Sequence, residues 1–327
     1  MANISTRFFG LNLSSPVIAA SCSMTGHVDQ ILKLAEAGAG AIVLKSIFEE
    51  EIYHELQEEL SLRSEMHSDP EYLDYFDYVI KEENIRKYVR LIAQVKMATK
   101  VPVVASINCI SSGDWVLFAR KIEEAGADAL ELNMYAYPDV YKSGENEEQF
   151  YFDTINKVLQ VVSIPVTIKI SHYFSNLTGI VQRLSQTGIA GITIFNRFYN
   201  QDIDVQSQTV VTADVFSSPC DYILPLRWTG LLSGVTSCEL AATTGVHSTE
   251  TALKFLLAGA SAVQIASVLY KEGPSAITRI NQGISDWMDE KGFGKLADFK
   301  GTLSRSSSSE QAWERVQFMK YFGEKAF

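Results

Sequence analysis

The stretch EAGADALELN, residues 124–133, decides the fold of this chain because its pattern returns three more times. The other copies are EAGAGAIVLKS at 36–46, QTGIAGITIFN at 186–196 and LAGASAVQIAS at 257–267. In each copy a helix ends, a glycine supplies a left-handed C-cap, and a short apolar strand follows. The repeat therefore indicates a chain built from helix–strand units.

A second pattern alternates with the first. It reads SPVIAAS at 15–21, VPVVASIN at 101–108, IPVTIKI at 164–170 and, without the proline, ELAATTG at 239–245. Proline is tolerated at the first position of a strand, where no ladder N–H is needed. Together the two patterns predict eight strands, which begin near residues 17, 41, 103, 129, 165, 191, 239 and 262.

Helical patterns separate these strands, for example over 84–99, 113–125, 147–162, 175–187 and 248–258. Eight short apolar strands that alternate with helices indicate a parallel sheet covered on both faces. We therefore predict an α/β chain folded as a single TIM (β/α)8 barrel over residues 1–300, with an open doubly wound sheet as the alternative. Residues 301–327 are expected to be a linker, which contains SSSS at 306–309, and an amphipathic helix.

Long insertions follow the second, fourth and sixth strands, over 47–83, 134–146 and 196–224. In a barrel such loops lie at the C-terminal face, where barrel enzymes carry their active sites. The segment 49–83 is acidic and rich in tyrosine, and we expect it to form a small helical cap on the barrel.

Composition excludes several classes of function. The 327 residues are 46% hydrophobic and 20% charged, as in globular proteins, and the net charge of −11 argues against nucleic acid as a partner. None of the four cysteines forms a Cys-x-x-Cys pair, so no metal, iron–sulfur cluster or disulfide framework is expected. We see no signal peptide and no apolar run of 18 residues, so the expected location is cytoplasmic, without membrane contact.

Polar residues end most of the predicted strands and would meet at one mouth of the barrel. They are Ser21, Lys45, Ser46, Asn108, Asn133, Lys169, Asn196, Gly245 and Ser267. No pair of facing carboxylates can be placed among them, which excludes glycosidase chemistry. A lysine here could form a Schiff base with a carbonyl substrate. Two lysines among several amides fit better with a flat ring that becomes anionic, such as a reduced flavin.

The last two units carry a second signature. TGVHS at 244–248 leads into a helix, and Ala266 and Ser267 follow the eighth strand. The loops after strands seven and eight of a barrel often bind phosphate, and Gly245 would allow close backbone approach.

These residues together resemble the class 1 dihydroorotate dehydrogenases, which depend on FMN, from about residue 8 to 300. The similar pieces are NLSSPV at 12–17 with AS at 20–21, LKS at 44–46, ELN at 131–133, IK at 168–169 and ETALKFLLAGASAVQ at 250–264. The resemblance implies a cytoplasmic flavoprotein oxidoreductase of pyrimidine biosynthesis that moves a hydride from a dihydropyrimidine-type substrate to flavin N5.

The resemblance also implies roles for matching positions. The flavin ring and ribityl chain would be lined by Ala20, Ser21, Ser46, Asn108 and Asn133. Lys45 would lie between flavin and substrate, and Lys169 would approach flavin N1 and O2. The FMN phosphate would be held by Gly245, Val246, Ala266 and Ser267. The substrate would contact Lys45, Asn133, Asp139 and Asn196, and the catalytic residues would be Lys45, Tyr137 and Lys169.

The sequence departs from the family where the substrate would bind. The family usually has Asn-Leu-Ser-Cys-Pro-Asn after the fourth strand, with the cysteine as general base, whereas this chain has NMYAYPD at 133–139. Alignment on the proline puts Tyr137 at the base position and Asp139 in place of a substrate-binding asparagine. A tyrosine with an ordinary pKa near 10 is a poor base at neutral pH unless a cation such as Lys45 lowers that pKa.

Three functions therefore remain open at this point. The first is an FMN oxidoreductase acting on dihydroorotate or on another small cyclic or acidic substrate. The second is a flavin-free Schiff-base lyase or aldolase using Lys45 or Lys169, and the third is an FMN-binding protein without catalysis. The sequence also leaves open a homodimer and a separate electron-transfer subunit.

Overall fold

Eight parallel strands form a closed ring. The computed structural model describes residues 2–48, 70–108, 112–135, 147–197, 201–307 and 313, with backbone alone for 70–79, 81, 112–114 and 147. The ring strands are β3 (Val17–Ala19), β4 (Ala41–Val43), β6 (Val103–Asn108), β7 (Ala129–Asn133), β8 (Val166–Ile170), β9 (Gly191–Ile194), β12 (Glu239–Thr243) and β13 (Ala262–Ile265). Their order is β4-β3-β13-β12-β9-β8-β7-β6, and β4 also pairs with β6. This pairing closes the sheet, so the barrel is confirmed and the open sheet is wrong.

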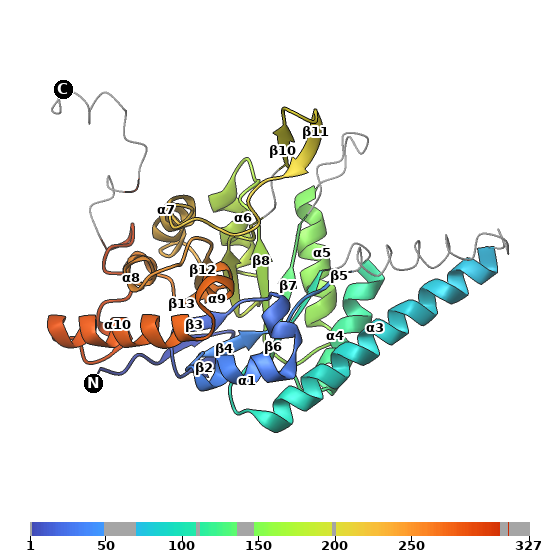
Figure 1. The fold of residues 1–327 in the computed structure, drawn as a ribbon, viewed down its shortest axis with the longest axis horizontal. Coiled ribbons are helices and arrows are strands. Elements are labelled where there is room, and N and C mark those ends of the chain that lie inside the picture. Colours follow the sequence, from blue (N-terminus) through green and yellow to red (C-terminus); the bar gives the residue numbers. More distant parts are fainter. Residues whose placement is uncertain are drawn as a thin grey trace.

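Helices surround the ring (Figure 1). They are α1 (Val28–Glu36), α3 (Pro70–Ala98), α4 (Ser112–Glu124), α5 (Glu147–Leu159), α6 (Leu177–Leu184), α7 (Ile223–Leu232), α8 (Thr249–Ala258), α9 (Ser267–Glu272) and α10 (Ser275–Lys291), with short 3-10 turns η1 (Ser23–Gly26) and η2 (Leu296–Asp298). One expectation needs correction. Residues 70–83, which we assigned to a separate cap, form the first half of α3, a single helix of 29 residues. Residues 49–69 lie outside the described part of the chain.

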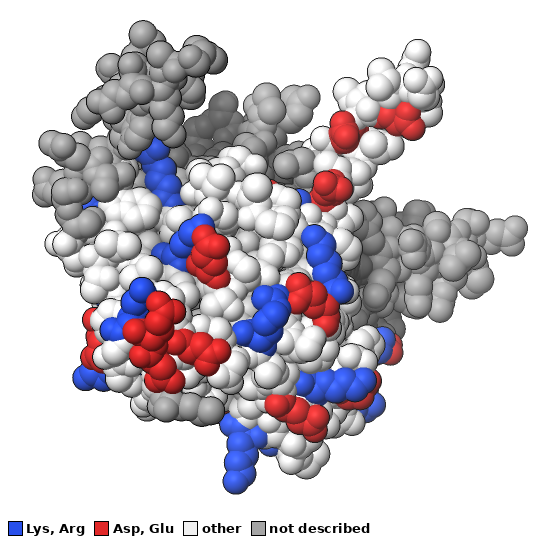
Figure 2. Space-filling view, turned by 60° about the vertical axis from the view of Figure 1, so that its left-hand side comes forward, with Lys and Arg blue, Asp and Glu red and all other residues white. Residues whose placement is uncertain are grey.

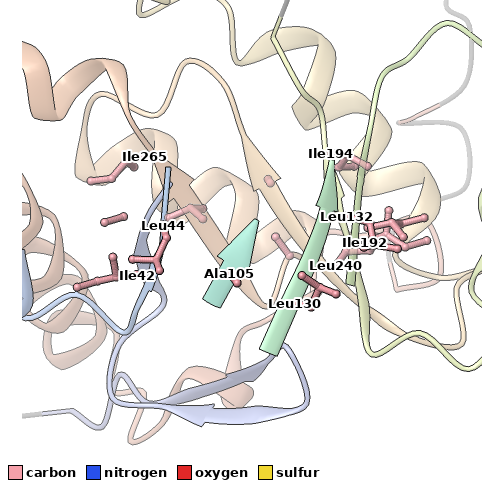
Figure 3. Packing of buried hydrophobic residues seen from close by; sticks show 14 of the residues in the cluster. Ile42, Leu44, Ala105, Leu130, Leu132, Ile192, Ile194, Leu240 and Ile265 are labelled. Carbon is pink, nitrogen blue, oxygen red and sulfur yellow. The ribbon is translucent and has the colours of Figure 1, made fainter. Parts of the chain in front are cut away.

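Alternate residues of every strand face the helices and form the outer core. Figure 3 labels members of this cluster from several strands, among them Ile42, Leu130, Ile192 and Ile265. They are all buried, as are the helix residues that meet them. Because side chains alternate along a strand, the residues between them must face the barrel interior.

The interior is apolar near the strand starts. This lower interior cluster consists of Phe8, Phe9, Leu13, Ile18, Ala41, Val43, Val104, Ala129, Ala241 and Ala262. The first three come from a hairpin of β1 (Thr6–Phe8) and β2 (Leu11–Leu13), which the sequence analysis did not predict. The hairpin closes the N-terminal end of the barrel. A Cβ added to Gly191 would lie 2.8 Å from the Phe8 ring, so the ring packs directly on the β9 backbone.

The loop after the sixth ring strand forms a second unpredicted hairpin. Its strands, β10 (Gln201–Asp204) and β11 (Thr209–Thr212), are exposed along their whole length and project beyond the strand ends (Figure 1). The Arg197 guanidinium donates to the carbonyl oxygens of Asp214 and Val215 at 2.8 and 2.7 Å and ties the base of this loop. A further short strand, β5 (Ile47–Phe48), pairs in parallel with the last two residues of β6 at the same end.

Residues 301–305 return to the barrel wall. Backbone N–H groups of Gly301, Leu303 and Arg305 donate to carbonyl groups of α8 and α7 at 2.9 Å. The proposed domain boundary at 300 stays a prediction, and the expected tail helix lies outside the described residues. On the face shown in Figure 2, acidic and basic side chains alternate and no broad basic area is visible. None of the helices described is long and apolar enough to cross a membrane.

Candidate functional site

Two residues beyond the lower interior cluster, the inward positions of five strands become polar. Lys45, Ser106, Glu131, Thr243 and Gln264 follow Val43, Val104, Ala129, Ala241 and Ala262 at this spacing. The C-terminal half of the barrel interior therefore carries polar side chains, at the end where the sequence analysis expected a site.

Four buried side chains form what we call the interior polar network: Glu131, Lys169, Thr193 and Gln264. The Lys169 ammonium donates to Gln264 Oε1 at 3.2 Å, and Gln264 Nε2 donates to Glu131 Oε2 at 2.6 Å. The Thr193 hydroxyl also donates to Glu131 Oε2, at 3.1 Å. Lys169 is 8% exposed, and the other three are 1% exposed or less. Of these, sequence analysis singled out only Lys169.

Two amide side chains meet across the end of β8. Asn133 ends β7, Asn196 follows β9, and Asn196 Nδ2 donates to Asn133 Oδ1 at 2.8 Å. Because β8 lies between β7 and β9 in the ring, this pair stands beside the strand that carries Lys169. The structure thus brings together three residues that the sequence predicted for flavin and substrate.

A chain of hydroxyl groups links the C-terminal ends of β3, β4 and β6. The Ser21 and Ser46 hydroxyls are 3.0 Å apart, and those of Ser46 and Ser106 are 2.6 Å apart. The Ser106 N–H donates to the Tyr88 hydroxyl at 2.8 Å, and that hydroxyl donates back to the Ser106 carbonyl at 3.2 Å. Burial raises the pKa of Tyr88 well above its usual value. Tyr88, on α3, was missed because nothing in the sequence pairs it with β6.

Lys45, Ala20 and Asn108 complete this side of the mouth. The Lys45 side chain is exposed, and its backbone N–H donates to Thr25 O at 3.2 Å. Ala20 is buried, and its N–H donates to Ile265 O at 2.9 Å. Asn108 is half-buried at the end of β6. All three therefore lie at the ends of neighbouring strands, as predicted.

The loops after β12 and β13 form the opposite side. Thr244 and Gly245 have φ values of 77° and 74°, a conformation that strongly favours glycine. A Cβ on Gly245 would lie 2.2 Å from Tyr222 N, so the close backbone approach at this glycine is to residue 222. Val246 is buried beside it, and Ala266 caps α9 just before Ser267.

Ser217 connects these two loops. Its N–H donates to Ser267 Oγ at 2.9 Å, its hydroxyl lies 2.9 Å from His247 Nε2, and its carbonyl accepts from the Lys271 ammonium at 3.2 Å. Burial, followed by the Lys271 charge, lowers the pKa of His247, so this imidazole is neutral at pH 7. Ser217 lies in an irregular loop and Lys271 on α9, and both were missed because nothing in the sequence indicates that they meet.

His172 is another residue that the sequence analysis missed. It follows β8 by two residues, and its ring centroid lies 5.7 Å from that of Phe195, the neighbour of Asn196. Burial lowers the pKa of His172, so the ring is neutral at pH 7 and able to accept a proton. Tyr137 and Asp139, the predicted base and substrate residue, lie outside the described residues.

A hollow of about 630 Å³ lies at the other end of the barrel, beside the strand starts. Arg7, Glu239 and Lys300 line it, together with several serines. None of the predicted site residues lines this hollow. Among the described residues no group of three or more metal-binding side chains is found.

The fold and the site together define a class: a (β/α)8 barrel whose C-terminal mouth carries a buried lysine and a pair of hydrogen-bonded amides. Comparison with known proteins narrows this class. A family model described as dihydroorotate dehydrogenase matches residues 75–288. The chain belongs to the dihydroorotate dehydrogenase family.

Individual relatives agree with this assignment. Dihydroorotate dehydrogenase B (NAD(+)), catalytic subunit, of Thermoplasma volcanium is 25% identical over 92% of this chain and 98% of its own length. Its counterpart in Thermoplasma acidophilum is 26% identical over 93% and 100%. Dihydroorotate dehydrogenase A (fumarate) of Lactococcus lactis subsp. lactis is 27% identical over 70% and 74%.

Proposed function

We propose that this chain is an FMN-dependent oxidoreductase that acts on a CH–CH group and takes dihydroorotate as its donor, in pyrimidine biosynthesis. Membership of the dihydroorotate dehydrogenase family supports this activity. The observation that carries the proposal is the Lys169 ammonium, which is held inside the barrel mouth beside the paired amides of Asn133 and Asn196.

The residues present suit FMN. An ammonium and amide groups suit a ring system with carbonyl oxygens and ring nitrogens, and Ala20 adds only a methyl group at the end of β3. We assign Ser21, Ser46, Asn108 and Asn133 to the ring and ribityl chain. We assign Gly245, Val246, Ala266 and Ser267 to the phosphate. Bound FMN supplies the hydride acceptor, flavin N5.

The protein's own groups would orient the donor and hold charge. Lys45 and Asn196, with Asn133, present one cation and two amides to a cyclic acid with ring N–H and C=O groups. Asp139 would contribute from the neighbouring loop. With FMN bound, Lys169 would stabilise negative charge near flavin N1 and O2. The flavin-free lyase with a Schiff base is not favoured, because the matched family consists of dehydrogenases.

A proton must leave the donor carbon while hydride departs, and two residues compete for the role of base. Tyr137 aligns in sequence with the family's base position, whereas the His172 ring, whose pKa is lowered by burial, lies 5.7 Å from the ring of Phe195, the residue before Asn196. We retain Tyr137 as the proposed base. Tyr137→Phe should then slow flavin reduction several-fold or more, and His172→Gln should not. The reverse result would transfer the role to His172.

The electron acceptor divides the relatives. Two are named for NAD(+) and called catalytic subunits, and one is named for fumarate. The chain has no Cys-x-x-Cys pair for an iron–sulfur cluster of its own. We therefore propose that a nicotinamide acceptor would be reached through a companion subunit. A homodimer also stays a prediction, which sedimentation analysis would test.

Anaerobic titration tests the function. Purified protein should carry a visible flavin band and release FMN on heating, and dihydroorotate under nitrogen should bleach that band. Protein without flavin that cannot be loaded with FMN would contradict the proposal. If the protein binds FMN but dihydroorotate does not bleach it, the assignment of the cofactor stands and the assignment of dihydroorotate as donor is wrong.

A further inference from the structure

The interior polar network has one feature that the proposed function does not use. Glu131 Oε1 is buried and has no hydrogen-bond partner, whereas Oε2 accepts from both Gln264 and Thr193. A carboxylate placed so deep is costly unless an opposite charge compensates for it. The described cation nearest to it in this network is the Lys169 ammonium, on the far side of the Gln264 amide.

The two partners of Gln264 fix its orientation. A carboxylate oxygen can only accept and an ammonium can only donate, so Nε2 must face Glu131 and Oε1 must face Lys169. The amide is therefore a polarised link between a negative and a positive group, with distances of 2.6 and 3.2 Å. Reversing the amide would place donor against donor and acceptor against acceptor.

We propose that Glu131 and Gln264 are positioning residues for the flavin reaction: Gln264 holds the Lys169 ammonium toward the cofactor, and Glu131 sets how much positive potential it delivers. This inference rests on the proposed FMN function. A lysine without this link could turn toward the exposed mouth, whereas Gln264 keeps it at 8% exposure. The negative charge of Glu131 then opposes the stabilisation that Lys169 gives to the reduced, anionic flavin.

Opposite shifts of the flavin midpoint potential test the charge. Glu131→Gln removes a negative charge with almost no change of shape. The ratio of reduced to oxidised FMN at a fixed potential should therefore rise about tenfold, which corresponds to a rise of about 30 mV in the midpoint potential of a two-electron couple. Lys169→Met should move the ratio in the opposite direction by at least as much. Thr167→Val is the matched control, because Thr167 is a buried interior residue beside Glu131 whose hydroxyl contacts Leu130 O instead of the network. It should leave the potential unchanged.

A structure of the flavin-free Gln264→Met variant tests the orientation without relying on cofactor or turnover. The Lys169 ammonium should leave its position beside residue 264, and the affinity for FMN should fall about tenfold. An ammonium that stays in place would overturn the positioning role. If Glu131→Gln fails to fold, this structure still tests whether Gln264 positions the Lys169 ammonium.

The two proposals fail differently. A wild-type protein that binds no FMN contradicts the function, while the flavin-free structure still reports on Gln264. A wild type that binds FMN and is bleached by dihydroorotate, together with Glu131→Gln at the potential of Thr167→Val, contradicts this inference and leaves the function standing.

Discussion

The two halves of the barrel interior are built by the same strands and have opposite chemistry. Near the strand starts, the lower interior cluster is apolar and is closed by Phe8, Phe9 and Leu13. One inward position later, Glu131 and Gln264 introduce buried polar groups joined to Lys169. The difference shows how a barrel separates stability from chemistry. An inward side chain near the start of a strand packs in the core, and the inward side chain two residues later belongs to the polar site.

The N-terminal half should respond to truncation through stability alone. Phe8→Ala removes a fully buried ring that packs on the Gly191 backbone, so the free energy of unfolding should fall by about 3–5 kcal/mol. Urea denaturation measures the loss. Asn12→Ala, at an exposed position of the same hairpin, is the control and should change little. Folded Phe8→Ala protein that loses its FMN affinity selectively would break the separation between the halves.

The second largest loss of stability is expected at the loop assigned to phosphate. Gly245→Ala forces a side chain into a left-handed conformation and against Tyr222 N, so it should cost about 2–4 kcal/mol. Gly292→Ala is a matched control: its φ of 75° equals that of Gly245 within a degree, but nothing lies within 4 Å of an added Cβ. It should cost about 1 kcal/mol.

Thermal or urea unfolding of both variants isolates the contact with residue 222 from the backbone strain. Bound FMN should distinguish them as well, because only Gly245 lies in the loop assigned to phosphate. Equal losses of stability in the two variants would mean that the close approach at Gly245 is relieved without cost.

Much of the barrel could be predicted because its strands are apolar and most of them follow a glycine or a proline. The eight predicted starts fall within one residue of the observed strands, since glycine caps such as Gly259 or prolines such as Pro102 precede seven of the eight strands, all but β12. The two hairpins could not be predicted in the same way. The strand Gln201–Asp204 is wholly exposed and polar at every position except Ile203, so no alternation of apolar and polar residues distinguishes it from a loop.

The site residues also divide into those that the sequence could predict and those that it could not. Residues at strand ends, such as Lys169 and Asn196, could be placed because parallel strands end at one mouth. Glu131 and Gln264 lie inside apolar runs, and their partnership depends on strands that are 133 residues apart. Tyr88 contacts the β6 backbone from a helix, and the sequence gives no register between that helix and β6. Ser217 depends on the path of an irregular loop.

The smallest predicted effect concerns the outer support of the polar half. Tyr88→Phe keeps the ring but leaves the Ser106 N–H without its partner inside the barrel wall, so unfolding free energy should fall by about 1–2 kcal/mol. This is less than the loss expected from Phe8→Ala, because a hydrogen bond is removed and the packing is kept. Urea denaturation at pH 7 measures it.

Alkaline pH sharpens the same test, because Tyr88 must stay protonated in the folded protein. Burial raises its folded pKa above the unfolded value of about 10, so the folded state binds more protons above pH 10 and stability falls as pH rises. Relative to wild type, Tyr88→Phe should lose this contribution and show a shallower decline, by about 1.4 kcal/mol per pH unit. Ser106→Ala keeps the backbone groups that hold Tyr88, so it should retain the wild-type slope. A Tyr88→Phe slope equal to that of wild type would mean that the hydroxyl ionises in the folded barrel, and that the wall behind the mouth admits water.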